Sequence, residues 1–265
     1  MESSEDFRPL RYRSRWFCYL DLLGFAALVS DKNIEQVIPL YKNALAEMER
    51  IASPKKKHGV IYSWFSDTFI IYSRGGSEQD FAYVEHVGRV FFQQLILHRI
   101  PVRGALTYGT LYSQSSKNIF VGPALIDAYC YGENQDWLGF VLTPSAFSRL
   151  SETIVDLRYR AHYRPVTESG IINHQPSSPI YAFAFNNGTV NGKNLYLSAL
   201  EEMKQKAGPR YAQKYENTIS FIRKQICHWG QSQYQPISFA IGVRANISQY
   251  RGNISSPNTR KCVHG

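Results

Sequence analysis

The sequence has few cysteines and no long apolar run, and both absences narrow the class of protein. Its 265 residues include four cysteines, far apart and without a CxxC pair or a nearby CxxH: Cys18, Cys130, Cys227 and Cys262. This spacing disfavours a zinc site of that type and a disulfide scaffold, and it favours a reducing compartment. Because there is no apolar run of about 18 residues and no signal-peptide segment, we expect a soluble cytoplasmic protein with no membrane partner.

Basic residues outnumber acidic ones, but no long basic tract gathers them. Lys and Arg total 30 against 21 Asp and Glu, a net charge of +9. This balance favours polyanionic partners: nucleic acid, a membrane surface or a phosphorylated small molecule. The chain lacks a clustered stripe of basic and aromatic residues, so a nucleic-acid-binding protein is the weakest of our interpretations. The local basic groups are a lysine run at 55–57 and four arginines near the start: Arg8, Arg11, Arg13 and Arg15. A short lysine run of this kind is typical of a solvated loop.

Hydrophobic patterning predicts alternating strands and helices over the first 150 residues. Hydrophobic residues make up 44% and charged residues 19%, a globular composition with enough length to build a core. Strands are predicted over 16–20, 59–65, 68–73, 102–108, 119–121 and 140–142, the second and third forming a hairpin. Helices are predicted over 33–51, over 81–98, from Pro123 and after Thr143; Pro39 predicts a kink or a later start in the first of them. This order predicts a mixed α/β sheet whose helices cover one face.

The C-terminal part is less regular. Residues 151–178 are polar and loop-rich, a strand is predicted over 180–185, and an amphipathic stretch over 194–228 breaks into two helices at Gly208-Pro209. We expect residues 1–150 to form the main domain and residues 151–230 to complete it. Residues 231–265 are rich in Gln, Ser and Asn, so we expect a disordered tail.

Two aspartates have strongly apolar neighbours. Asp21 closes the first strand ahead of a turn at Gly24, and Asp67 lies at the hairpin tip. If the strand and the hairpin are neighbours, both carboxylates project from one edge of the sheet. Two carboxylates about 4 Å apart repel by roughly 4 kcal/mol at an effective dielectric of about 20, a cost that a divalent cation offsets. Mg²⁺ and Mn²⁺ favour carboxylate and carbonyl oxygens, so the carbonyl of Leu22 is a further candidate ligand; the alternative is a turn cap and an ordinary hairpin residue.

Four segments resemble, in order, the motifs of the class III nucleotidyl cyclase catalytic domain: 21–25 (DLLGF), 65–68 (FSDT), 102–109 (VRGALTYG) and 122–129 (GPALIDAY). Together with the C-terminal amphipathic stretch, they look most like the pyrimidine cyclases of the bacterial Pycsar antiphage system. The similarity runs from about Trp16 to Leu150. It implies an α+β sandwich with a mostly antiparallel sheet, a ferredoxin-like core and a C-terminal helical extension.

The resemblance also implies a site and a reaction. It implies a homodimer with two composite active sites, a nucleoside triphosphate substrate and two Mn²⁺ or Mg²⁺ ions per site. By motif position, Asp21 and Asp67 are catalytic and bind the metal, Leu22 adds its carbonyl, and Gly24 and Phe25 lie against the triphosphate. The ribose 3′-oxygen would attack the α-phosphorus and release pyrophosphate. The implied product is cyclic UMP from UTP, or alternatively cyclic CMP from CTP, and a separate effector protein would respond to it.

Several positions depart from the family pattern. Many class III cyclases carry an Asn and an Arg, four apart, where this chain has Ile126 and Cys130. The purine-reading lysine falls near Ser63, a candidate nucleotide-binding residue, and its partner falls near Ile119. These departures argue against an ordinary adenylate or guanylate cyclase, and they leave open an inactive nucleotide-binding module. Arg103, on a predicted strand, either binds nucleotide through a phosphate or pairs with an acidic side chain.

Overall fold

The computed structural model describes residues 12–25, 34–150, 162–166, 180–185, 189–190 and 193–231. In these ranges the main sheet contains β1 (Arg13–Leu22), β2 (Val60–Phe65), β3 (Thr68–Ser73), β4 (Val102–Gln114), β5 (Ile119–Val121), β6 (Phe140–Leu142), β7 (Tyr163–Pro165) and β8 (Tyr181–Phe183). Its order is β2-β3-β1-β4-β6-β8-β7, and β5 pairs with β4 beside this path. The β4–β6 pair is parallel and the other pairs are antiparallel, so the sheet is mixed and mostly antiparallel, as the resemblance implies.

Strand β1 lies at the centre of the sheet because both of its faces are apolar. Its residues from 15 to 22 are all buried. Alternate side chains point to opposite faces, so Trp16 and Cys18 contact one layer while Phe17 and Tyr19 contact the other. The strand pairs with β3 on one side and with β4 on the other. The prediction of a strand over 16–20 is confirmed, and the strand is longer at both ends.

The hairpin has the predicted turn, and its strands differ from the predicted ones only in that β2 begins at Val60. Strands β2 and β3 pair from Val60–Ser73 to Phe65–Thr68, which leaves Ser66 and Asp67 as a two-residue turn. Ser66 has a φ of 54°, in the left-handed region that tight hairpin turns use.

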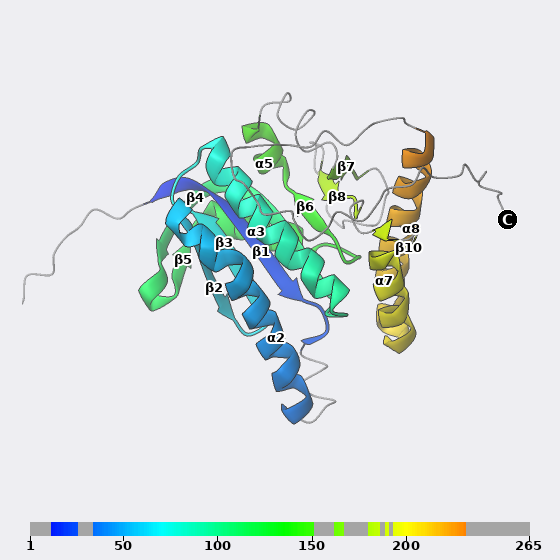
Figure 1. Cartoon of the computed structure of the whole chain (residues 1–265). Helices are drawn as coiled ribbons and strands as arrows, with labels where there is room; N and C mark the ends of the chain where they lie inside the picture. The colour runs from blue at the N-terminus through cyan, green and yellow to red at the C-terminus, as the bar shows by residue number, and fades with distance from the viewer. Residues whose placement is uncertain are drawn as a thin grey trace, which may run out of the picture.

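Helices cover both faces of the sheet. On one face lie α2 (Ile34–Ala52), which contains Pro39 and so does not start after it, and α3 (Glu78–Leu97). Figure 1 shows these two helices across the front of the sheet. The predicted one-sided cover needs a correction, because α4 (Pro123–Glu133) packs on the opposite face with Ala124 and Ala128 next to Phe17. Their small side chains let the helix approach the sheet closely.

Strand β4 runs past Gly109, where the sequence predicts its end. Gly109 pairs with Arg15 of β1, and a Cβ at this position would lie 3.3 Å from the Cα of Ala124. The glycine therefore makes room for α4 and does not terminate the strand. The extension of β4 pairs with β5 between Tyr112 and Gln114.

Short elements and two C-terminal helices complete the fold. The short helices include η1 (Ser53–His58), η2 (Ser115–Lys117) and α5 (Pro144–Arg149). A small second sheet pairs β9 (Thr189–Val190) with β10 (Lys193–Asn194). Helices α7 (Leu195–Lys206) and α8 (Pro209–Gln231) are separated at the predicted break. Tyr196, Leu200 and Ile222 from these helices belong to the same core cluster as Trp16.

Two predictions about the C-terminal part can be compared with the structure only in part. The strand predicted over 180–185 is shorter, because Ile180, Ala184 and Phe185 are buried but lie outside β8. The predicted tail, beyond Gln231, lies outside the described residues. Among the helices that are described, none is long and apolar enough to cross a membrane.

Candidate active site

The structure brings Asp21 and Asp67 to the same end of adjacent strands. Asp21 pairs across the β1–β3 ladder with Thr68, the residue that follows Asp67. The amide of Leu22 donates a hydrogen bond of 3.0 Å to the carbonyl oxygen of Asp67. The main chain thus ties the end of β1 to the hairpin turn. Asp21 is buried and Asp67 is half-buried.

The carboxyl group of Asp21 is strongly perturbed. Burial, the negative charge of Glu133 and that of Asp67 raise its pKa from 3.8 to about 7, against the opposing effect of Arg103. A nearby cation would stabilise the ionised form of this carboxyl group. Groups with strongly shifted pKa values concentrate at functional sites.

Arg103 pairs with acidic side chains, one of the two arrangements that the sequence allows. Its Nε and Nη2 atoms donate to Oδ2 of Asp21 at 3.3 and 3.2 Å. The same guanidinium forms an ion pair with the carboxylate of Glu133 and donates from Nη1 to the Glu133 carbonyl at 2.6 Å. Arg103 is only 9% exposed, so these contacts hold it in place behind Asp21.

Glu133 is the site residue that sequence reasoning missed. It is the last residue of α4, and its Oε1 atom accepts a hydrogen bond of 3.0 Å from the Tyr19 hydroxyl. Burial and the neighbouring carboxylates in turn raise the pKa of Tyr19. No motif marks Glu133, because its contact with Arg103 depends on how α4 crosses the second face of the sheet.

Gly24 lies in the turn after β1, and Phe25 directly follows it. Gly24 has a φ of 74°, and among the described residues beyond its two neighbours no atom lies within 4 Å of the place that a Cβ would occupy. With respect to those residues, the main chain has room for close approach by a ligand at this turn. The ring of Phe25 lies 5.8 Å from that of Tyr41, between their centroids.

Ser63 does not contact the other predicted residues. It lies on β2, and β3 separates it from β1. Its hydroxyl donates a hydrogen bond of 3.1 Å to Oδ1 of Asn118, which lies between η2 and β5. The structure thus places one hydroxyl and one side-chain amide together on the exposed side of β2.

Ile126 and Cys130, at the two positions that depart from the family pattern, lie on the exposed side of α4. Ile126 is 64% exposed and Cys130 is exposed. Residues four apart share one face of a helix, so the spacing of the family pair is kept while its chemistry is absent.

The oxygen atoms at this edge fit a hard divalent cation. Both hydrogen bonds from Arg103 go to Oδ2 of Asp21, and none is formed to its Oδ1 by any described residue. Within the described ranges no group of three His, Cys, Asp or Glu side chains could hold a metal. Two carboxylates and the carbonyl of Leu22 are enough for Mg²⁺, which keeps several waters and binds substrate phosphates.

Comparison with known proteins identifies the fold. No family model and no curated protein matches the sequence. The guanylate cyclase domain of RhGC from Catenaria anguillulae, in complex with GTP, aligns over 65% of this chain and 96% of its own, at 12% identity and a TM-score of 0.51. The catalytic core of a rhodopsin-guanylyl cyclase with converted specificity, in complex with ATPαS, aligns over 65% and 95%, at 12% identity and a TM-score of 0.50. The chain therefore has the fold of nucleotidyl cyclase catalytic domains.

Proposed function

We propose that this chain is a divalent-metal-dependent nucleotide cyclase that converts UTP into 3′,5′-cyclic UMP and pyrophosphate. The observation that supports it best is the meeting of Asp21, Asp67 and the Leu22 main chain at one edge of a sheet with the cyclase fold. The structures with GTP and ATPαS support a nucleoside triphosphate as the substrate class. Bound Mn²⁺ or Mg²⁺ would lower the pKa of the ribose 3′-hydroxyl and offset the charge of the triphosphate.

Each residue at the edge has a role in this proposal. Asp21 and Asp67 would hold the ions, and Arg103 orients Asp21 through the bonds to its Oδ2. Gly24 and Phe25 lie against the triphosphate. The 3′-hydroxyl loses its proton to solvent, its oxygen forms a bond to the α-phosphorus, and the bond from that phosphorus to the departing pyrophosphate breaks.

The base would be read away from this edge, at Ser63. Its hydroxyl and the Asn118 amide replace the long basic side chain that the resemblance places here in purine cyclases. This pair supports a pyrimidine base, and because an amide both donates and accepts hydrogen bonds, CTP is the alternative substrate. The product would act as an antiphage signal that a separate effector protein detects.

Exposed apolar side chains support a homodimer with composite sites. Ile126 and Tyr129 on α4 are 64% and 52% exposed, and Phe65 at the hairpin is 83% exposed. Val121 of β5, at 59%, adds to the exposed apolar side chains. Ile126 and Tyr129, three positions apart, share one face of α4, and a second copy of the chain is the partner that this proposal assigns to that face.

The activity test uses the purified protein with Mn²⁺ and each of the four nucleoside triphosphates, followed by mass spectrometry. We expect cyclic UMP and pyrophosphate from UTP. Asp67→Ala should abolish turnover without unfolding the chain. The control variant Glu49→Ala, which removes an exposed acidic side chain from α2, should keep normal turnover. Product from ATP or GTP alone would refute the pyrimidine assignment, and full activity of Asp67→Ala would refute the site.

A second candidate is a nucleotide-binding or dimerisation module without turnover. The exposed Ile126 and Cys130 favour it, because neither side chain can stabilise a phosphate. Measurable release of pyrophosphate would exclude this candidate.

A further inference from the structure

A pocket lined by arginines lies at the opposite end of β1 from Asp21. It has a volume of about 220 Å³. Three arginines and two serines supply its polar lining, and Ile61 and Tyr72 supply its apolar wall. No acidic side chain lines it in the part of the chain that the structure describes.

The strand order brings these arginines together. Arg13 and Arg15 alternate along β1, so both side chains lie on the same face of the sheet as Asp21. Arg74 directly follows β3, and its amide donates to the carbonyl of Gly59 at 3.1 Å. Ser113 of β4 and Ser115 at the start of η2 complete the pocket. Residues far apart in the sequence thus converge on one small volume.

Arg15 is held rigidly within this pocket. It is only 6% exposed, and its Nη1 atom donates to the Ser113 hydroxyl at 3.0 Å. Its guanidinium carbon lies 5.8 Å from the centre of the Tyr72 ring. Tyr72 is itself buried and packs against Phe120 of β5 at 5.8 Å. A guanidinium fixed in this way loses little conformational entropy when it binds an anion.

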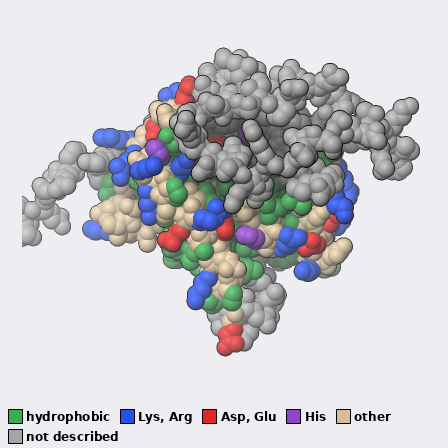
Figure 2. All heavy atoms as spheres, viewed as in Figure 1, with side chains coloured by type: hydrophobic (Ala, Val, Ile, Leu, Met, Phe, Trp, Pro, Cys, Tyr) green, Lys and Arg blue, Asp and Glu red, His purple; other side chains and the backbone are tan. Residues whose placement is uncertain are grey.

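The pocket differs from the other charged places on the described surface. Arg50, Arg99 and Arg223 each pair with a glutamate. A larger pocket of about 410 Å³ between α7 and α8 is lined by both signs of charge and contains the Lys204–Glu216 ion pair. On the face in Figure 2, Lys and Arg side chains are scattered among other types. The lining of the pocket at Tyr72, by contrast, combines three arginines with no acidic side chain among the described residues.

We propose that this pocket binds the phosphate or diphosphate group of a small soluble ligand, at a site separate from the metal-binding edge. Guanidinium groups bind phosphate oxygens through paired hydrogen bonds, and the serine hydroxyls add two further donors. The pocket is smaller than the roughly 300–1,000 Å³ of sites that enclose a whole ligand, so it fits an anionic group. Arg15 and Asp21 are six positions apart on β1, roughly 20 Å along the strand. The proposal is independent of the cyclase activity.

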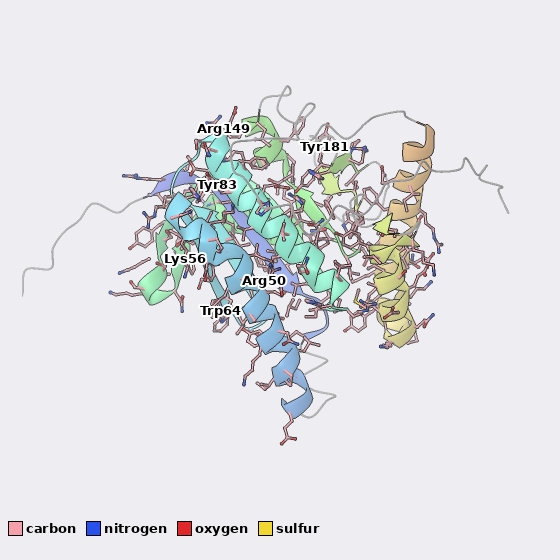
Figure 3. All side chains as sticks on the ribbon, in the orientation of Figure 1. Arg50, Lys56, Trp64, Tyr83, Arg149 and Tyr181 are labelled. Carbon is pink, nitrogen blue, oxygen red and sulfur yellow. The ribbon has the colours of Figure 1, made fainter. Side chains whose placement is uncertain are left out.

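The test is calorimetric titration of the full chain with inorganic phosphate, pyrophosphate and UMP in the presence of EDTA. The chelator removes divalent ions, so the aspartate edge has no cation with which to bind an anion. We expect Arg13→Gln/Arg74→Gln to weaken pyrophosphate binding by roughly tenfold or more, because both side chains line the pocket. Arg50→Gln/Lys56→Gln is the matched control. It removes the same charge at two residues outside the pocket, which are labelled in Figure 3.

Each outcome decides the proposal. A loss confined to the pocket variant supports it; competition by UMP then indicates a nucleotide phosphate, and binding of the inorganic anions alone indicates a free phosphate. Equal weakening of both double variants would overturn it, since attraction to the overall positive charge would then explain the binding. Failure of all three anions to bind would also overturn it. Asp67→Ala should bind pyrophosphate normally, which separates this site from the proposed cyclase site.

Discussion

Replacing Asp21 by asparagine should stabilise the folded chain above neutral pH while removing activity. The pKa of this carboxyl is about 7 in the folded chain and 3.8 ordinarily, mainly because of burial. A group with a higher pKa in the folded state binds its proton more readily there. Folding stability is therefore lost as the pH rises from about 4 to about 7, and the full penalty remains above that range. Asparagine, which never ionises, avoids the penalty.

The size of this effect follows from the two pKa values. Their difference corresponds to roughly 4 kcal/mol, at about 1.4 kcal/mol for each pKa unit. Two effects reduce this free energy: solvent reaches the side chain of Asp21, which is 12% exposed, and asparagine pairs more weakly than aspartate with Arg103. We therefore expect Asp21→Asn to gain roughly 2 kcal/mol of folding stability at pH 8. At pH 4.5 the gain should fall to about 0.5 kcal/mol or less, because the penalty accumulates as the pH rises from about 4 to about 7 and pH 4.5 lies near the start of that range.

Urea unfolding of both proteins in EDTA, at pH 8 and pH 4.5, measures this gain. Repeating the pH 8 measurement with Mn²⁺ should stabilise the original chain by about 2.7 kcal/mol at a hundredfold excess over the dissociation constant, and Asp21→Asn much less. If Asp21→Asn is less stable than the original chain at pH 8, pairing with Arg103 outweighs burial and the reasoning is wrong. Equal stabilisation of both proteins by Mn²⁺ would place the metal elsewhere.

Four further changes test other parts of the structure. Glu133→Gln removes a charge that raises the pKa of Asp21, so the acidic limb of the activity–pH profile should move to lower pH; an unchanged profile would refute the coupling. Arg89→Ala leaves Glu85, 2% exposed, without its ion-pair partner and should cost about 3 kcal/mol or more in urea unfolding, whereas a cost below about 1 kcal/mol would contradict the burial of the pair. Ser66→Gly should add up to about 1 kcal/mol by relieving the positive φ, and a loss of stability would count against that strain. Ile126→Asp should produce monomers in light scattering and abolish turnover; active dimers would show that α4 is not at the interface.

The elements that the sequence predicts well are those with local signals. The hairpin follows from two β-rich runs around a two-residue polar pair, and the break between α7 and α8 follows from Gly208-Pro209. The position of Asp21 beside Asp67 needs one further assumption, that β1 and the hairpin are neighbours, and the structure pairs them.

The parts that the sequence does not predict depend on packing between distant segments. Gly109 has the sequence signal of a strand end, but its lack of a side chain serves the contact with α4. The ion pair between Arg103 and Glu133 joins a strand to the end of a helix 30 residues later, and no spacing rule indicates it. The arginine pocket likewise requires the pairing of β1 with both β3 and β4 before Arg15 and Arg74 can meet.

Helix α4 exposes Ile126 and Tyr129 on its outer side and ends at Glu133, whose carboxylate contacts Arg103. A rotation of this helix by a fraction of a turn would withdraw one negative charge from the guanidinium and change how readily the neighbouring aspartate gives up its proton. Whatever covers the outer side of α4 can therefore adjust the acid–base state of the sheet edge without touching it.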